Sequence, residues 1–200
     1  VDMLTEISNQ GILPFRYVLA DSVYANSSEF IDAIEALTGV TYLLQIPEDT
    51  LCWLKHPVVI QKTYQYGGQQ HTKDVVADQV KAPRCVRAFG TGMNDFFWYR
   101  RKVSEGTKGP IEYEFTKRRV TISRHGMPWK TVWLLIRRTL EPEPTYSYFI
   151  SNAPLSVPLA KLVWLSGLRW AIEQCFEETK TELGMDQYEV RKFPGWHHHI

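Results

Sequence analysis

Residues 16–21 read RYVLAD and residues 41–46 read TYLLQI. Both are short, nearly continuous apolar runs, a pattern typical of strands that are buried on both faces of a parallel sheet. Residues 1–11 predict the end of an amphipathic helix that stops at a glycine, and residues 27–37 predict a second helix with a serine cap. The order helix, strand, helix, strand indicates the α/β class.

The pattern changes between residues 47 and 151. Short runs rich in β-branched and aromatic residues alternate there with turn formers, which predicts a mainly antiparallel β insertion. A long helix should then open at Ser156 or Pro158 and end near Leu183. We therefore divide the chain into part of a core at residues 1–46, the β insertion at 47–151, and a C-terminal part of the core at 152–200.

The composition excludes several classes of protein. The chain is 44% apolar over 200 residues, which is enough to bury a core. Its three cysteines are widely spaced and form no CxxC pair, so neither a disulfide framework nor a zinc site is signalled. No apolar run approaches the roughly 20 residues that a membrane-spanning helix needs, so we expect no membrane partner and a cytoplasmic protein.

The net charge of +1 conceals a strong asymmetry along the chain. Residues 1–50 hold one basic and eight acidic residues, a net −7, whereas residues 100–138 hold eleven basic and three acidic residues, a net +8. A basic segment of this kind is a candidate surface for a polyanion such as DNA. Charge runs are more often solvated faces, so the charge by itself leaves both interpretations open.

Three charged residues share one strip of the predicted C-terminal helix. At about 100° per residue, Glu173 falls about 40° and Lys180 about 20° from Arg169. The strip lies beside the apolar stripe of the helix, formed by Leu165, Leu168, Ile172, Phe176 and Leu183. This predicts a carboxylate between two cations at the edge of the core. Because Arg169 and Glu173 are four residues apart, an ordinary intrahelical ion pair is the alternative.

Asp21 supplies a second candidate carboxylate. It follows the first predicted strand at its C-terminal end, where α/β sheets place their active sites. Two carboxylates from separate elements can hold a divalent metal through hard oxygen ligands. A turn or helix-capping role for Asp21 is the alternative.

These residues resemble the DDE-superfamily transposases of bacterial insertion sequences. The second catalytic aspartate of that family ends a strand and is soon followed by an aromatic residue, as Asp21 and Tyr24 are here. Its glutamate lies in an R-x3-E-x6-K pattern, which Arg169, Glu173 and Lys180 match. The similarity to the family's C-terminal signature continues through ELG at 182–184, YEVR at 188–191 and GWHHH at 195–199. The resemblance implies a partial RNase H-like core, interrupted by the β insertion, with a long C-terminal catalytic helix.

Two features depart from the family pattern. The pattern has a tyrosine three residues before the arginine, and Ser166 stands there, which weakens a DNA contact at that position. The first catalytic aspartate belongs on a strand upstream of residues 1–11, and Asp2, on helix-like sequence, is no substitute. We therefore expect a fragment truncated at both ends that is inactive by itself.

The resemblance implies an enzyme that hydrolyses DNA phosphodiesters and transfers DNA strands with two Mg²⁺ ions, for which Mn²⁺ substitutes. Asp21 and Glu173 would be its catalytic metal ligands. Arg169, Lys180 and Tyr24 would contact DNA. The implied partners are the transposon ends and target DNA, together with a second copy of the chain in a synaptic complex. The implied location is the nucleoid in the bacterial cytoplasm.

The basic β insertion would bind the DNA backbone without regard to sequence. The residues expected to make this contact are Arg100, Arg101, Lys102, Lys117, Arg118, Arg119, Arg137 and Arg138. Interleaved aromatic residues, namely Trp98, Tyr99, Trp129 and Trp133, could stack on a frayed base. The alternative is that they are core positions of β-strands.

Two other functions stay open. The chain could be a non-catalytic, DNA-binding remnant of a transposase, or an unrelated metal-dependent α/β nuclease that uses the same two carboxylates. The histidines at 197–199 do not indicate a further metal site, because consecutive side chains on a helix diverge by about 100°.

Overall fold

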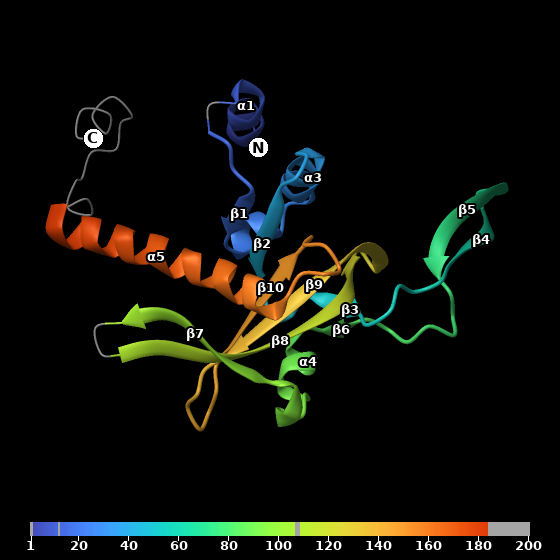
Figure 1. Ribbon diagram of the computed structural model, residues 1–200. Helices are drawn as coiled ribbons and strands as arrows, with labels where there is room; N and C mark the ends of the chain where they lie inside the picture. Colours follow the sequence, from blue (N-terminus) through green and yellow to red (C-terminus); the bar gives the residue numbers. More distant parts are fainter. Residues whose placement is uncertain (1, 12, 107–108, 184–200) are drawn as a thin grey trace.

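The computed structural model describes residues 2–11, 13–106 and 109–183, apart from a few side chains, chiefly in the last helix. In this part of the chain, a mixed sheet of eight strands dominates (Figure 1). Its strands are β1 (Tyr17–Ala20), β2 (Thr41–Ile46), β3 (Leu51–Trp53), β6 (Arg84–Cys85), β7 (Tyr99–Gly106), β8 (Gly109–Arg124), β9 (Met127–Arg138) and β10 (Tyr146–Ser151). The order across the sheet is β1-β2-β10-β9-β8-β3-β6, and β7 also pairs with β8.

The remaining elements are helices and one small sheet. The helices are α1 (Asp2–Gln10), α2 (Ser22–Ala25), α3 (Ser28–Ala36), α4 (Arg87–Thr91) and α5 (Leu159–Leu183), and a single 3-10 turn covers Asp95–Phe97. Strands β4 (Val59–Tyr66) and β5 (Gln69–Val76) form a separate two-stranded sheet. No helix in the described ranges is long and apolar enough to cross a membrane.

Parallel and antiparallel pairing meet at β2. This strand runs parallel to β1 on one side and antiparallel to β10 on the other. The connection from β1 to β2 passes through α2 and α3, and the Ser27 hydroxyl caps α3 by accepting a hydrogen bond from the Phe30 backbone N–H at 3.1 Å. The sheet continues from β2 into β10 without a break, so strands from both sides of residue 46 belong to one sheet. The division of the chain at residues 46 and 151 stays a prediction.

The apolar run of β2 serves two cores. Tyr42 and Leu44 face the layer that contains α3, whereas Leu43 faces the layer that contains α5. Successive side chains of a strand point to opposite faces, so a strand covered on both sides is apolar at every position. Leu162 and Leu165 of α5 are almost fully buried in the second core.

One expectation about burial is met in part and another is wrong. Both faces of β1 pack against a core, Val18 and Ala20 on one face and Tyr17 and Leu19 on the other, but only Val18 is buried, because β1 lies at the edge of the described sheet. Phe176, expected in the apolar stripe of the last helix, is 59% exposed. In Figure 1 the C-terminal end of α5 extends beyond the strands of the sheet.

Candidate functional site

Asp21 lies where β1 ends and α2 begins. Its backbone is extended, and its Oδ1 accepts a hydrogen bond from the Val23 N–H at 3.0 Å, so it is the N-cap of α2. The capping role considered from the sequence is therefore present. It uses a single carboxylate oxygen and leaves the side chain exposed to solvent. Capping is thus compatible with a metal at the remaining oxygen.

Tyr24 stands one turn after Asp21 on the same short helix. Its ring lies 5.1 Å from the Phe30 ring, centroid to centroid, and 54% of the residue is exposed. One part of the ring therefore rests on the α3 core, while the rest faces solvent beside Asp21. Its contact with DNA stays a prediction.

Helix α5 carries Arg169, Glu173 and Lys180, the residues that match the R-x3-E-x6-K pattern. The side chains of Arg169 and Glu173 lie outside the described part of the structure, as do residues 184–200 with the histidines at 197–199. Lys180 is exposed. The joint site of Asp21 and Glu173 therefore stays a prediction.

Helix α5 nevertheless packs against the strand that leads to Asp21. The ring of Trp164 lies 5.7 Å from the ring of Tyr17, edge to face, and the Lys161 ammonium lies over both rings. Ser166 is buried, and its hydroxyl donates to the Val163 carbonyl at 2.7 Å. The hydroxyl of Ser166 is therefore turned to the backbone of its own helix and closed to solvent.

The donor set at Asp21 fits a hard divalent cation in part. An exposed carboxylate with one oxygen left over is a suitable ligand for Mg²⁺. Within the described ranges, however, no three His, Cys, Asp or Glu side chains group closely enough to hold a metal ion.

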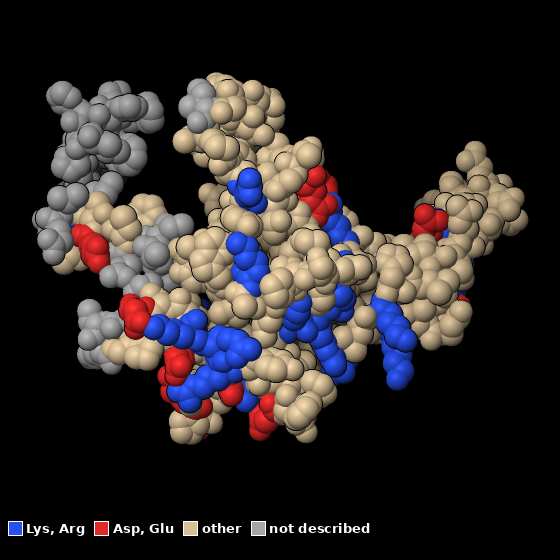
Figure 2. Space-filling model, viewed as in Figure 1, with Lys and Arg blue, Asp and Glu red and all other residues tan. Residues whose placement is uncertain are grey.

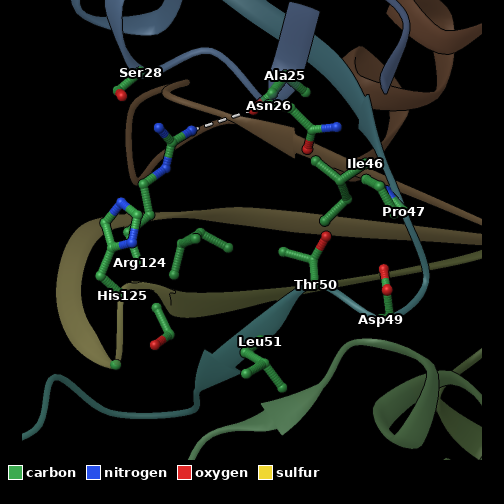
Figure 3. Close-up of a pocket in the computed structure, with 13 residues that line it drawn as sticks. Ala25, Asn26, Ser28, Ile46, Pro47, Asp49, Thr50, Leu51, Arg124 and His125 are labelled. Carbon is green, nitrogen blue, oxygen red and sulfur yellow. Dashed lines mark hydrogen bonds between the residues drawn. The ribbon is translucent and has the colours of Figure 1, made fainter. Parts of the chain in front are cut away.

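A pocket opens beside the carboxyl edge of β1 and β2. It measures about 420 Å³ and lies between the end of α2, the end of β2 and the β8–β9 turn. Figure 3 shows Arg124 and His125 on one side, with Asn26, Ile46 and Pro47 opposite them. An arginine and a histidine at this edge suit an anionic ligand such as a phosphodiester.

Arg124 is held in place by two contacts. Its guanidinium carbon lies 3.7 Å from the centroid of the Trp129 ring, and its Nη2 donates to the Ala25 carbonyl at 3.2 Å. Burial lowers the pKa of Arg124, and nearby Asp32 and Glu29 oppose that effect. A guanidinium keeps its charge in such surroundings, so Arg124 presents a fixed cation at the pocket.

Arg124 and His125 were missed from the sequence. His125 has a φ of 50° and Gly126 a φ of 75°, which makes the β8–β9 connection a tight two-residue turn. The RHG run at 124–126 could have predicted this turn, because a glycine between two β-rich segments is typical of such a turn. Only the fold reveals that the turn ends beside α2.

The basic surface of the insertion is partly neutralised. Figure 2 shows Lys and Arg side chains over the region of β7 and β8, with acidic side chains beside them. The ion pairs are Arg100 with Glu112, Lys102 with Glu105, and Arg138 with both Glu114 and Asp95. Acidic residues on β7, on β8 and in the 3-10 turn thus offset cations that the linear charge count left unpaired. Arg118 is exposed, and DNA contact by this surface stays a prediction.

Lys117 and Arg119 both lie close to the ring of one tryptophan. The Lys117 ammonium lies 4.2 Å and the Arg119 guanidinium carbon 5.4 Å from the centroid of the Trp133 ring. Trp133 is half-buried, and its indole N–H donates to the Pro154 carbonyl at 3.1 Å. Its ring therefore already contacts two cations, and base stacking by Trp133 stays a prediction.

The other aromatic candidates differ in exposure. Trp98 is 7% exposed and lies beneath Arg138, so it is a core residue. Trp129 is half-buried beneath Arg124. Tyr99 is 48% exposed, with Arg101 above its ring. Among the four, only Tyr99 keeps the exposure that base stacking requires.

Comparison with known proteins identifies the family of the chain. A family model described as DDE superfamily endonuclease matches residues 1–110, which is more than half of the chain. The match includes β1, Asp21, α2 and β2, and no curated protein matches the chain. On this match, the chain belongs to the DDE superfamily endonucleases.

Proposed function

We propose that the chain forms part of the catalytic domain of an insertion-sequence transposase from a bacterium, which cleaves DNA phosphodiesters and transfers DNA strands. One observation carries the proposal. Asp21, an exposed carboxylate at the carboxyl end of β1, lies inside the segment that matches the endonuclease family. That end of a parallel pair is where α/β sheets bind their ligands.

Asp21 and Glu173 would hold the metal. Carboxylates suit Mg²⁺ because it prefers anionic oxygen ligands and keeps several positions for water and substrate oxygens. Two bound Mg²⁺ ions, or Mn²⁺ in their place, would activate water and then a 3′-hydroxyl for in-line attack and stabilise the leaving oxygen. The role of this chain is to present the two carboxylates at the same edge of the sheet.

Several cations of the chain would orient the DNA. Arg169 and Lys180 on α5 would bind phosphates, the arginine as a two-pronged donor and the lysine as a point charge. Arg124 would add a third contact at the pocket, since its guanidinium is already fixed by Trp129 and Ala25. Arg118 and Arg119 would extend the contact along the backbone of the duplex.

Strand transfer by residues 1–200 alone is expected to be weak. The sequence supplies two of the three carboxylates of the family pattern, and Asp2 belongs to α1 rather than to a strand. Loss of one metal ligand removes charge stabilisation that the two-metal reaction needs. A second copy of the chain would meet the first across paired transposon ends in a synaptic complex.

Calorimetric titration with Mn²⁺ tests the metal site. Asp21→Asn and Glu173→Gln each remove a negative charge with little change of shape, and both should abolish binding. Asp49→Asn is the matched control, because Asp49 is an exposed aspartate that lines the pocket at the same edge of the sheet. It should bind Mn²⁺ as the unaltered chain does.

The outcomes separate the candidate functions. Binding lost in Asp21→Asn and Glu173→Gln but kept in Asp49→Asn supports a shared catalytic site. If all four proteins bind equally, Asp21 and Glu173 do not ligate the metal and the catalytic proposal fails. If none binds Mn²⁺ while the unaltered chain still binds duplex DNA, the non-catalytic DNA-binding function takes its place.

A further inference from the structure

Strands β4 and β5 form a hairpin that projects from the body of the protein (Figure 1). The strands pair from Val59↔Val76 at the base to Tyr66↔Gln69 at the tip. Gly67 and Gly68 connect them with φ angles of 59° and 76°. Positive φ at both central residues is the type I′ geometry, which matches the twist of a two-stranded ribbon.

The side chains of this hairpin do not pack into a core. Every residue of β4 is exposed, and β5 is exposed except for partial cover at His71, Val75 and Val76. A lone two-stranded hairpin is only marginally stable in water. Both of its faces are therefore open to a partner.

The two faces of the hairpin differ in charge. Since alternate residues share a face, one face carries the cross-strand pairs Lys62↔Lys73, Tyr64↔His71 and Tyr66↔Gln69. The opposite face carries Gln61↔Asp74, Thr63↔Thr72 and Gln65↔Gln70. We name the first set the lysine face. It combines two cations with three ring-bearing side chains and contains no acidic residue.

Lys62 and Lys73 stand directly opposite each other. Like charges in this position destabilise a strand pair. Lys62 pairs with Asp78 at 2.8 Å, but Lys62 is 45% and Asp78 81% exposed at the side chain, so the pair contributes little and can exchange for another anion. Lys73 lies 5.6 Å from the Tyr64 ring centroid. The repulsion is relieved when an anion bridges the two ammonium groups.

The ring-bearing side chains are ordered beside the lysines. Tyr64 and His71 stack with their ring centroids 5.6 Å apart, and the His71 ring also meets Tyr66 edge to face. Tyr66 at the tip is 76% exposed. The lysine face thus presents cations along its length and polar rings at its end.

We propose that the lysine face of this hairpin binds double-stranded DNA. The major groove, about 12 Å wide, admits a two-stranded β-ribbon. Lys62 and Lys73 would neutralise phosphates along the groove, while Tyr66 and Gln69 at the tip reach into it. The inference rests on the proposed function, because it assigns DNA to a surface outside the catalytic edge and outside the basic β7–β9 segment.

The experiment measures binding of the full chain to a short fluorescein-labelled duplex of mixed sequence by anisotropy, over a range of salt concentrations. The test variant is Lys62→Gln with Lys73→Gln. One control, Lys55→Gln with Lys81→Gln, removes the same charge from exposed positions outside the hairpin. A second control adds Gln65→Lys and Gln70→Lys to the test variant, which moves both charges to the opposite face at unchanged composition.

We expect the test variant to bind the duplex more weakly than the unaltered chain does. The control with Lys55→Gln and Lys81→Gln should bind as the unaltered chain does. Each lost phosphate contact makes the slope of log K against log salt shallower by about 0.9. The variant with lysines on the opposite face should bind no better than the test variant. Thermal melting checks that all variants stay folded, which is expected because the altered side chains are exposed.

Two results would overturn the inference. Equal binding by the unaltered chain and the test variant removes the hairpin from the interface and leaves the proposed function intact. Full recovery with lysines on the opposite face shows that net charge alone matters. If the unaltered chain binds no duplex at all, the proposed function itself fails.

Discussion

The guanidinium carbon of Arg124 lies over the Trp129 ring, 3.7 Å from its centroid. Arg124 belongs to β8 and Trp129 to β9, on either side of the tight β8–β9 turn. The same guanidinium donates to the Ala25 carbonyl at the end of α2. A single side chain therefore links the β insertion to the helix that Asp21 caps.

Replacing Arg124 should loosen this link. Arg124→Ala removes a cation–π contact and leaves the Ala25 carbonyl without its donor, so unfolding should become easier by about 1–3 kcal/mol. Urea denaturation measures the loss. Arg118→Ala is the control, since an exposed arginine away from such contacts should change stability by less than about 0.5 kcal/mol. Equal midpoints for the two variants would contradict the structural role of Arg124.

The two roles of Asp21 can be separated by substitution. Asparagine caps a helix about as well as aspartate, so Asp21→Asn should keep the stability of the unaltered chain and lose Mn²⁺ binding. Asp21→Ala should lose Mn²⁺ binding and, in addition, about 1 kcal/mol, because the Val23 N–H loses its acceptor. Thermal melts and calorimetry on the same samples give both quantities. Metal binding retained by Asp21→Asn would leave Asp21 with the capping role alone.

Gly167 sets how closely α5 approaches β7. A Cβ at this position would lie 2.8 Å from Val103 Cγ1 and 3.0 Å from the Val103 carbonyl oxygen. Gly167→Ala should therefore destabilise the fold by about 1–3 kcal/mol, partly offset by the roughly 1 kcal/mol that alanine gains over glycine in a helix. Adding Val103→Ala removes the Cγ1 clash and should restore part of the lost stability. The recovery should be incomplete, because the Val103 carbonyl oxygen stays in place.

Denaturation of these variants forms a double-substitution cycle that measures the coupling between Gly167 and Val103. Cys175→Ala, at an exposed position on the same helix, serves as the control and should be near neutral. Additive effects of Gly167→Ala and Val103→Ala would show that the close approach does not limit the packing of α5.

Alkaline pH should destabilise the protein through Cys52. Burial, with a smaller contribution from Cys85, raises the pKa of the Cys52 thiol from 9.0 to about 12. Below pH 9 the thiol is protonated in both the folded and the unfolded chain, and its contribution to stability is complete. Between pH 9 and about 12 the unfolded chain releases a proton that the folded chain keeps, so stability falls by about 1.4 kcal/mol per pH unit.

Urea denaturation at several pH values compares the unaltered chain with Cys52→Ala. The variant lacks this dependence and should show a shallower decline of stability above pH 9. Burial also raises the pKa of Tyr42, which adds a decline at higher pH that both proteins share. Identical slopes in the two proteins would show that the Cys52 thiol ionises as readily folded as unfolded.

The local sequence pattern determined the elements at the carboxyl ends of β1 and β2. The run at 41–46 is β2 at the same residues, and the serine cap predicted for the second helix is Ser27 of α3. Both follow from short-range chemistry, because strand periodicity and capping depend on neighbours in the chain. The order of residues also placed Asp21 at the end of a strand.

Only the tertiary structure decided which residues share a surface. The sequence counted eleven cations at 100–138, and the sheet pairs several of them with acidic side chains on neighbouring strands. It brings Arg124 to Ala25, a residue 99 positions away. It also leaves the lysine face of the β4–β5 hairpin without a core. Strand order and register set these contacts, and no local pattern encodes them, because they depend on which distant segments pair.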